Sequence, residues 1–339
     1  MRALGCLALL FAACRAPTAP GPGGATGATA PAPPPRAAPA APAEKDVMQP
    51  RAVRERALGS LAERSPSLRR AFDPAGFTPL RRPGPHDWLA NHPEAGQTFA
   101  EFVASRPNTP DQVRRFVDLW PLGDFPADRS PPLPRLVAYA GAFFALEARA
   151  LPAAPLDRLA VKTRVNPGTR KRQLLAPDVL DALKGHLRPD AFCVAAVTME
   201  DLYPEASWNF VFGLASFRER VGVYSFARYD PAFFGEPRGA GYRDLILRRS
   251  LKVMVHELGH MFGLGHCVYF ECLMNGSNHL DEADARPHHL CPVCLRKLHH
   301  AVGFDPAARY RALERFYRAA GMAADADLAA TRAARSSGP

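Results

Sequence analysis

The pattern of apolar and polar positions predicts strands and helices in mixed order through the middle of the chain. Short apolar runs rich in β-branched and aromatic residues predict strands within 115–120, 159–165, 191–199, 209–216 and 221–229. Helical spacing of apolar residues predicts helices over 51–72, 136–151, 176–187 and 244–264. This order implies a mixed, mostly parallel sheet with helices on its faces, which is an α/β (α+β) fold.

Both ends of the chain depart from this pattern. Residues 15–44 are almost wholly Ala, Pro, Gly and Thr, a composition that cannot bury a core and that favours an extended tether. The last residues are also biased in composition, and we expect them to fray. We therefore divide the chain into a signal peptide (1–13), a tether (14–50), an N-terminal helical extension (51–110), a main domain (111–320) and a disordered tail (321–339).

The first fourteen residues resemble a bacterial lipoprotein signal. One Arg precedes an apolar run over 3–13 that is too short to span a bilayer, and Cys14 follows it. In such signals the cysteine is lipidated after cleavage, so we expect an exported, membrane-anchored lipoprotein. Two alternatives stay open. Ordinary secretory cleavage would give a secreted or periplasmic protein, and an N-terminus that is never processed would leave the protein in the cytoplasm.

Composition limits the classes of partner. The chain has 339 residues, 47% of them hydrophobic, which is enough for a real buried core. A net charge of +10 raises the question of a nucleic acid or an anionic membrane. The arginines are widely spread, however, and no motif combines them with interleaved aromatic residues. We therefore expect a solvated basic surface, no nucleic-acid partner, contact with a membrane only through the lipid anchor, and a monomer.

The strongest chemical signal lies inside the helix predicted over 244–264. His256 and His260 are four residues apart and so share one face of that helix, where both can reach one Zn²⁺. Gly263 stands where the helix must end, and His266 completes HExxHxxGxxH. Three neutral His ligands leave a zinc position open, as in catalytic sites. Glu257, beside the metal, suits a general base that takes a proton from water.

Two further groups of residues follow this motif. Met274 stands where metzincins have the Met-turn that underlies the metal. Four cysteines follow His266 closely, at positions Cys267, Cys272, Cys291 and Cys294. A CxxC with two further cysteines nearby is the spacing of a closed, structural Cys₄ zinc site. The alternative, one or two disulfides, is open for an exported protein.

These motifs resemble the signature of the archaemetzincins, zinc metallopeptidases of the metzincin clan, and in particular their eukaryotic-type members. The resemblance extends to DWLANHPEAGQTF (87–99), to 190–216, to 221–229 and to 276–304. It implies a metzincin-like domain whose active-site helix carries HExxHxxGxxH beside a small Cys₄ zinc subsite. By position it assigns His256, His260 and His266 to catalytic zinc, Glu257 to the base, and the four cysteines to a structural zinc. Asn275 follows Met274, so no tyrosine stands close after the Met-turn.

The sequence therefore predicts a zinc-dependent peptidase that holds two Zn²⁺ per chain and acts on a peptide or protein substrate. The alternative is a non-catalytic zinc-binding lipoprotein that keeps the metzincin architecture. Glu257 argues against that alternative, because zinc binding by three histidines does not need a neighbouring carboxylate.

Overall fold

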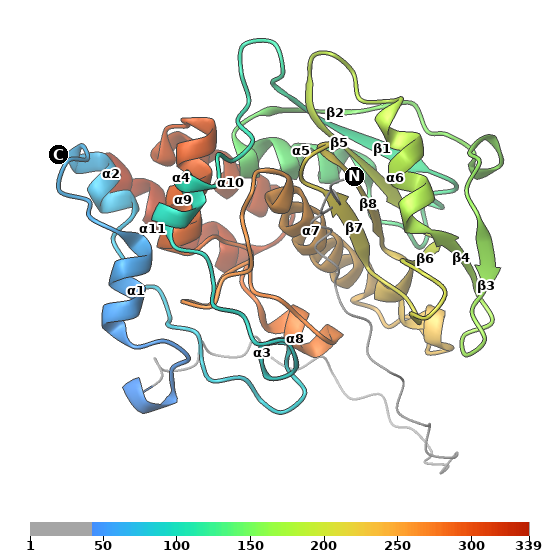
Figure 1. The fold of residues 1–339 in the computed structure, drawn as a ribbon, viewed down its shortest axis with the longest axis horizontal. Helices are drawn as coiled ribbons and strands as arrows, with labels where there is room; N and C mark the ends of the chain where they lie inside the picture. The colour runs from blue at the N-terminus through green and yellow to red at the C-terminus, as the bar shows by residue number, and fades with distance from the viewer. Residues whose placement is uncertain (1–42, 339) are drawn as a thin grey trace, which may run out of the picture.

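The computed structural model describes residues 43–338 (Figure 1). The predicted signal peptide 1–13, Cys14 and most of the tether 14–50 lie outside the described residues. The helices are α1 (Arg51–Leu58), α2 (Pro66–Ala71), α3 (Trp88–Asn91), α4 (Phe99–Ala104), α5 (Leu133–Phe144), α6 (Ala176–Lys184), α7 (Tyr242–Met261), α8 (Leu280–Ala285), α9 (Pro292–Val302), α10 (Pro306–Ala319) and α11 (Ala323–Ser337). The strands are β1 (Phe116–Leu122), β2 (Glu147–Ala150), β3 (Thr163–Val165), β4 (Arg172–Leu175), β5 (Ala191–Thr198), β6 (Asp201–Tyr203), β7 (Gly213–Ser216) and β8 (Val221–Ser225).

The main sheet has the strand order β2-β1-β5-β8-β7. Its pairings are parallel except for β7 with β8, which is antiparallel. The predicted mixed, mostly parallel sheet is thus confirmed. Strand β5 lies at the centre and is buried along its whole length, as expected for a strand covered on both faces.

Helices cover both faces of this sheet, α6 on one side and α5 with α7 on the other (Figure 1). Successive residues of β5 point to opposite faces. Val194 and Ala196 join the apolar cluster under α6, whereas Cys193, Ala195 and Val197 join the larger core under α5 and α7. The helix that carries the histidine motif is therefore held directly against the sheet.

Several elements differ from the sequence-based expectation. The helix expected over 51–72 is two helices, because Gly59 adopts a left-handed φ of 73° and Ser65 begins α2 as its N-cap. The helix expected over 136–151 ends at Phe144, and Ala145 (φ 53°) turns the chain into β2, which pairs with β1.

The strand regions are also shorter than expected. Within 159–165 only β3 is a strand, and it pairs with β4, whose strand partner β6 was not predicted. Of the runs 209–216 and 221–229, only β7 and β8 are strands, and a 3₁₀ helix follows at Ala227–Tyr229. Strands β3, β4 and β6 have only three or four residues each, too few for a period of two to stand out.

The expectation of a disordered tail over 321–339 is wrong for residues 323–337, which form α11. Ala326, Ala329 and Ala333 lie on one helical face and are buried. Arg332 places its guanidinium 3.6 Å from the ring centre of Phe77 and donates to the carbonyl of Gly76 at 2.7 Å. The alanine-rich composition that suggested fraying is also the composition of a good helix with a narrow contact stripe.

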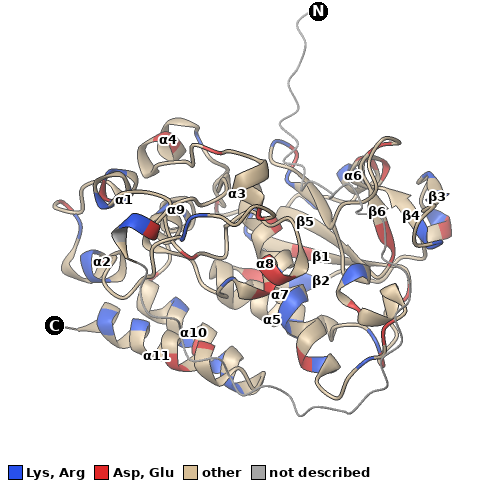
Figure 2. Ribbon diagram, turned by 90° about the horizontal axis from the view of Figure 1, so that it is seen from below, with Lys and Arg blue, Asp and Glu red and all other residues tan. Residues whose placement is uncertain are grey.

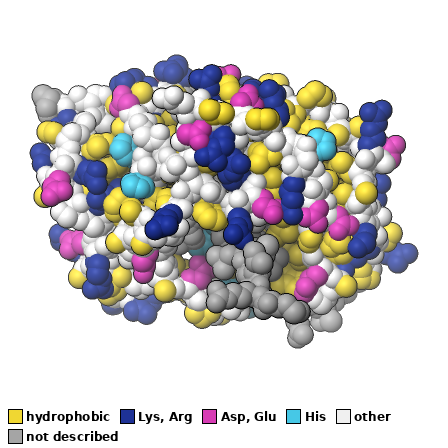
Figure 3. Space-filling model, turned by 45° about the horizontal axis from the view of Figure 1, so that its top comes forward, with side chains coloured by type: hydrophobic (Ala, Val, Ile, Leu, Met, Phe, Trp, Pro, Cys, Tyr) yellow, Lys and Arg dark blue, Asp and Glu magenta, His cyan; other side chains and the backbone are white. Residues whose placement is uncertain are grey.

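The N-terminal extension 51–110 shares the main core. Helix α1 packs on α9 and α2 packs on α11, at the opposite end of the molecule from α6 (Figure 1). Within the described residues, no helix is both long and apolar enough to cross a membrane. Lys and Arg are distributed over elements at both ends of the molecule (Figure 2). On the face seen in Figure 3, they are interspersed with acidic and apolar side chains.

Candidate metal centre

The three histidines of the motif converge at the C-terminal end of α7. His256 and His260 lie on one face of the helix, with their Nε2 atoms 3.1 Å apart, and His266 comes from the turn after it. One ligand atom from each histidine lies within 4.8 Å of the others. Zn–N bonds of about 2.0–2.1 Å in a tetrahedron place nitrogens about 3.3 Å apart. The spacing of the His256 and His260 nitrogens fits that geometry.

The Nδ1 atoms of these rings face hydrogen-bond acceptors. His256 Nδ1 donates to the carbonyl of Leu273 at 2.8 Å, and His260 Nδ1 donates to that of Leu264 at 2.6 Å. A carbonyl oxygen can only accept, so Nδ1 carries the proton in both rings. In the neutral imidazole, Nε2 then presents its lone pair, which is the form that binds a metal.

Electrostatics also keep the two helical histidines neutral. Burial lowers the pKa of His256 well below its usual value, and the neighbouring His260 and His266 lower it further. Burial and the neighbouring His266 likewise lower the pKa of His260 to about 3. Both rings are therefore deprotonated at neutral pH and available as ligands.

Glu257 is the most unusual polar group of the site. It is fully buried, and neither oxygen of its carboxylate has a hydrogen-bond partner among residues 43–338. Burial raises the pKa of this carboxyl to about 8. A cation held by the neighbouring imidazoles would favour its charged form again. The donor set and this isolated carboxylate both fit a bound zinc.

The turn after α7 and the Met274 turn support the histidines from below. Gly263 ends the helix with a φ of 86°, a conformation that favours glycine. Met274 is fully buried beneath Gly259, and its carbonyl accepts from the amide of Cys267 at 2.8 Å. Asn275 closes the loop, since its side chain bonds to the backbone of Cys267, Phe270 and Cys272.

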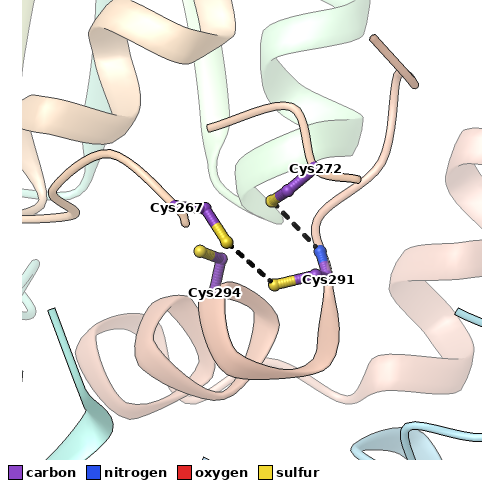
Figure 4. A group of neighbouring side chains, drawn as sticks. All are labelled: Cys267, Cys272, Cys291 and Cys294. Atoms are coloured by element: carbon purple, nitrogen blue, oxygen red, sulfur yellow. Dashed lines mark hydrogen bonds between the residues drawn. The ribbon is translucent and has the colours of Figure 1, made fainter. Parts of the chain in front are cut away.

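The four cysteines form a second cluster beside this turn (Figure 4). Cys267 and Cys272 come from the loop after His266, and Cys291 and Cys294 come from the start of α9. All four are buried and free, and their sulfurs lie within 4.8 Å of one another. The sulfurs of Cys267 and Cys291 are 3.6 Å apart. Tetrahedral zinc with Zn–S of about 2.3 Å requires about 3.8 Å, whereas a disulfide requires about 2.05 Å.

The pKa values of the thiols indicate how the cluster would respond to a bound cation. Burial raises the pKa of Cys272 and of Cys291 well above the usual value. Burial would also raise the pKa of Cys267, but hydrogen bonds from the other three thiols outweigh it and lower that pKa. The cluster alone therefore stabilises the Cys267 thiolate, and a metal is needed to hold four thiolates together.

Two contacts of the histidine site were not predicted from sequence. Glu94 accepts from His266 Nδ1 at 2.8 Å and from Trp88 Nε1 at 2.6 Å, both through Oε1. Burial would raise the pKa of Glu94, but the hydrogen bond and charge of His266 lower it overall. Gln97 accepts from the amide of Gly265 at 3.1 Å and donates to the carbonyl of Gly263 at 3.2 Å. The only signal in the sequence was the resemblance over 87–99.

A third group of potential ligands, Asp87, His279 and Glu282, also lies close together. These residues form hydrogen bonds with one another and with the backbone. His279 Nδ1 accepts from the amide of Glu282 at 3.2 Å, and Glu282 accepts from the amide of Trp88 at 3.1 Å. With Nδ1 accepting, the neutral His279 ring carries its proton on Nε2, which faces Asp87 at 3.4 Å. This group ties α8 to the segment around Trp88.

A pocket lies beside His256 and Glu257. Its apolar lining comes from several elements: Phe212, Tyr229, Val253, Leu273 and Leu280. The rings of Phe212 and Tyr229 stack with centroids 5.2 Å apart. The nearby cations are partnered, since Arg249 pairs with Asp284 at 2.6 Å and Lys252 donates to the carbonyl of Asp284 at 2.7 Å. The surface left for a ligand is largely apolar.

Comparisons with known proteins show which family the chain resembles. A sequence model described as peptidase family M54 matches residues 161–300. Archaemetzincin-2 of Macaca fascicularis and that of Homo sapiens are each 39% identical over 278 residues, covering 74% of this chain and 77% of theirs. Archaemetzincin-1 of Homo sapiens is 35% identical over 257 residues, covering 67% of this chain and 51% of its own.

Among solved structures, the crystal structure of archaemetzincin from Methanopyrus kandleri is 29% identical, with a TM-score of 0.43 over 57% of this chain and 97% of that chain. The identities to the mammalian proteins, over more than two thirds of this chain, settle the family. The chain belongs to the archaemetzincins, a family of zinc metallopeptidases.

Proposed function

We propose that this chain hydrolyses peptide bonds of a peptide or protein substrate at the three-histidine site. His256, His260 and His266 hold the catalytic zinc, Glu257 is the general base, and Cys267, Cys272, Cys291 and Cys294 hold a second, structural zinc. Met274 supports the catalytic site from beneath α7. The family membership supports the peptidase activity, and the two clusters of side chains support the two metal sites.

The observation that carries the proposal is the buried, unpartnered carboxylate of Glu257 one residue from His256. Burying a carboxyl group without a hydrogen bond costs several kcal/mol even when the group is neutral. A zinc site without catalytic activity would have no use for a buried carboxyl group at this position. The carboxylate therefore argues for catalysis and against the alternative, a non-catalytic zinc-binding lipoprotein.

Glu257 performs the proton transfers in this proposal. A zinc held by three imidazoles supplies Lewis acidity for the scissile carbonyl and makes water easier to deprotonate near neutral pH. Glu257 accepts the proton of the attacking water and delivers it to the leaving amine. The apolar walls around Glu257 limit competing water and strengthen these interactions.

The test compares the zinc-loaded full chain with Glu257→Gln on a diverse peptide library, with products read by mass spectrometry. Glu257→Gln keeps the size of the side chain but removes the base, so we expect both zinc ions to be retained and cleavage to fall at least about 10²–10⁴-fold. Glu63→Gln, at an exposed position, is the matched control and should cleave like the wild type. Substantial cleavage by Glu257→Gln would remove Glu257 from this role. Absence of cleavage by the wild type, with zinc bound, would favour the non-catalytic alternative.

We further infer, from the sequence alone, that Cys14 carries a lipid anchor and that the anchored chain acts as a monomer. In a bacterial host, Cys14→Ser should move the protein from the membrane fraction to the soluble fraction and abolish incorporation of a labelled fatty acid. Labelling that persists in Cys14→Ser would contradict the anchor. Light scattering of the detergent-solubilised protein tests the oligomeric state.

A further inference from the structure

The metal centre of this chain includes a segment that lies well before the part of the chain matched by the peptidase-family sequence model. Residues 84–98, called the strap here, cross the turn that carries His266. Glu94 binds His266, and Gln97 binds the amide of Gly265 and the carbonyl of Gly263. The match to the sequence model of peptidase family M54 begins only at residue 161. The strap therefore holds the third histidine from a distant part of the chain.

His266 differs from the other two histidines in the partner of its Nδ1 atom. His256 and His260 face backbone carbonyls, which are neutral, whereas His266 faces the carboxylate of Glu94. A carboxylate on the far nitrogen fixes the tautomer and the ring orientation of a histidine ligand and makes the ligating nitrogen more basic. The turn carrying His266 has no helix of its own to orient the ring, so this external acceptor matters most here.

The strap is itself fixed firmly enough to position a ligand. The edge of Trp88 meets the ring of His266, with centroids 5.3 Å apart, and its Nε1 donates to the same Glu94 oxygen. Trp88 packs so closely on Gly276 that a Cβ there would lie 2.3 Å from the indole. Glu282 of α8 accepts from the amides of Trp88 and Asn278, at 3.1 and 2.7 Å. Trp88 and Glu282 therefore connect the strap to the loop that follows Met274.

The other end of the strap is tied to the cysteine cluster. Lys297, a fully buried residue of α9, donates to the backbone and side-chain oxygens of Gln97. Cys291 is the N-cap of α9, and Cys294 lies in its first turn. The strap therefore links the helix of the structural metal site to the turn of the catalytic one.

We propose that Glu94 is a positioning residue for the catalytic zinc, holding His266 with its Nε2 lone pair directed to the metal. This inference rests on the proposed function for the identity of the metal. Residues 84–98 are then a part of the metal centre. A protein shortened to residues 161–300, the region matched by the family model, would lack the support that Glu94 gives to His266.

The test measures metal affinity and not activity alone. Full-length apoprotein is titrated with zinc against a chromophoric chelator, and the weaker of the two sites is assigned with His260→Ala. We expect Glu94→Ala to weaken zinc at the three-histidine site about 10–100-fold, as loss of such partners does. Glu94→Gln, which keeps a neutral acceptor of the same size, should recover part of that loss. The cysteine site should keep its zinc in both variants.

Two readouts separate positioning from a general loss of stability. Co²⁺ at the three-histidine site gives visible absorption bands that depend on ligand geometry, and these should shift in Glu94→Ala. Glu101→Ala removes the side-chain acceptor of the capping box of α4 and is the control, since it disturbs the same N-terminal region without touching His266. It should leave the affinity and the bands unchanged.

Unchanged zinc affinity and unchanged Co²⁺ bands in Glu94→Ala would overturn the inference. Equal losses in Glu94→Ala and Glu101→Ala would also overturn it, because the effect would then be one of stability. These outcomes are independent of peptide cleavage. If the wild type binds zinc tightly but cleaves nothing, the proposed function fails while the role of Glu94 is still decided.

Discussion

The Sδ atom of Met274 lies 2.8 Å from the position that a Cβ on Gly259 would occupy. Gly259 stands between the two helical histidines, so the thioether fills the space directly beneath them. The glycine is needed for close approach and not for an unusual φ, because it lies inside α7. The turn at Met274 therefore packs against α7 only because residue 259 has no side chain.

We predict that Gly259→Ala destabilises the site. A contact under 3.0 Å forces Met274 to move, and such overpacking costs about 1–3 kcal/mol of unfolding free energy. Thermal unfolding and zinc analysis should show a lower melting temperature and weaker binding at the three-histidine site. Gly239→Ala, where no atom lies within 4 Å, is the control and should behave like the wild type. Gly259→Ala should cost less when it is made in a Met274→Ala background than in the wild type; an equal cost in both backgrounds would show that the contact is not the cause.

We predict that Cys291→Ser removes one zinc ion per chain. The serine hydroxyl is a poor replacement for a thiolate, and loss of a structural metal lowers the unfolding free energy by about 4 kcal/mol or more. Metal analysis and denaturant unfolding provide the measurement. Cys193→Ala, at a buried free cysteine outside the cluster, should keep both zinc ions. A wild type that contains one zinc and no free thiols at these four positions would instead support disulfides.

We predict that the pocket beside Glu257 selects a large apolar side chain next to the scissile bond. Val253 lines it from α7, one turn before His256 and Glu257, so Val253→Phe should narrow it, and zinc analysis of the variant shows whether the metal ligands are undisturbed. Cleavage next to large apolar residues should fall about 10–200-fold in kcat/KM, and cleavage next to small residues should fall less. Val113→Phe, at a residue 65% exposed, is the control. Equal losses for all peptides would show that the pocket does not set the preference.

The part of the site that could be read from the sequence is the part made locally. His256, His260, His266 and Met274 lie within one helix and the loop after it, and the cysteines follow within the next 28 residues of chain. Helical geometry and ligand spacing are sufficient to bring such residues together. Glu94 is different, because 172 positions separate it from His266 and its placement depends on the whole tertiary fold.

The same distinction applies to the fold. Strand β5 was predicted because its apolar run is uninterrupted, and helix α7 was predicted because its helical pattern is long. Strands β4 and β6 were not predicted, because they have only four and three residues. Segments this short are defined by hydrogen bonds to neighbouring strands and not by an alternation of apolar and polar residues. The expectation of a disordered tail rested on the alanine-rich composition of 321–339, which does not show that Ala326, Ala329 and Ala333 would contact the rest of the core.

The placement of α11 has a consequence for how the chain reaches its native state. Arg70 bonds to the carbonyl of Arg335 across 265 positions, and Arg332 covers Phe77. Contacts of such long range form late, because the entropy of closing a large loop opposes them. The packing of α2 can therefore be completed only after α11 has been synthesised and has folded against it.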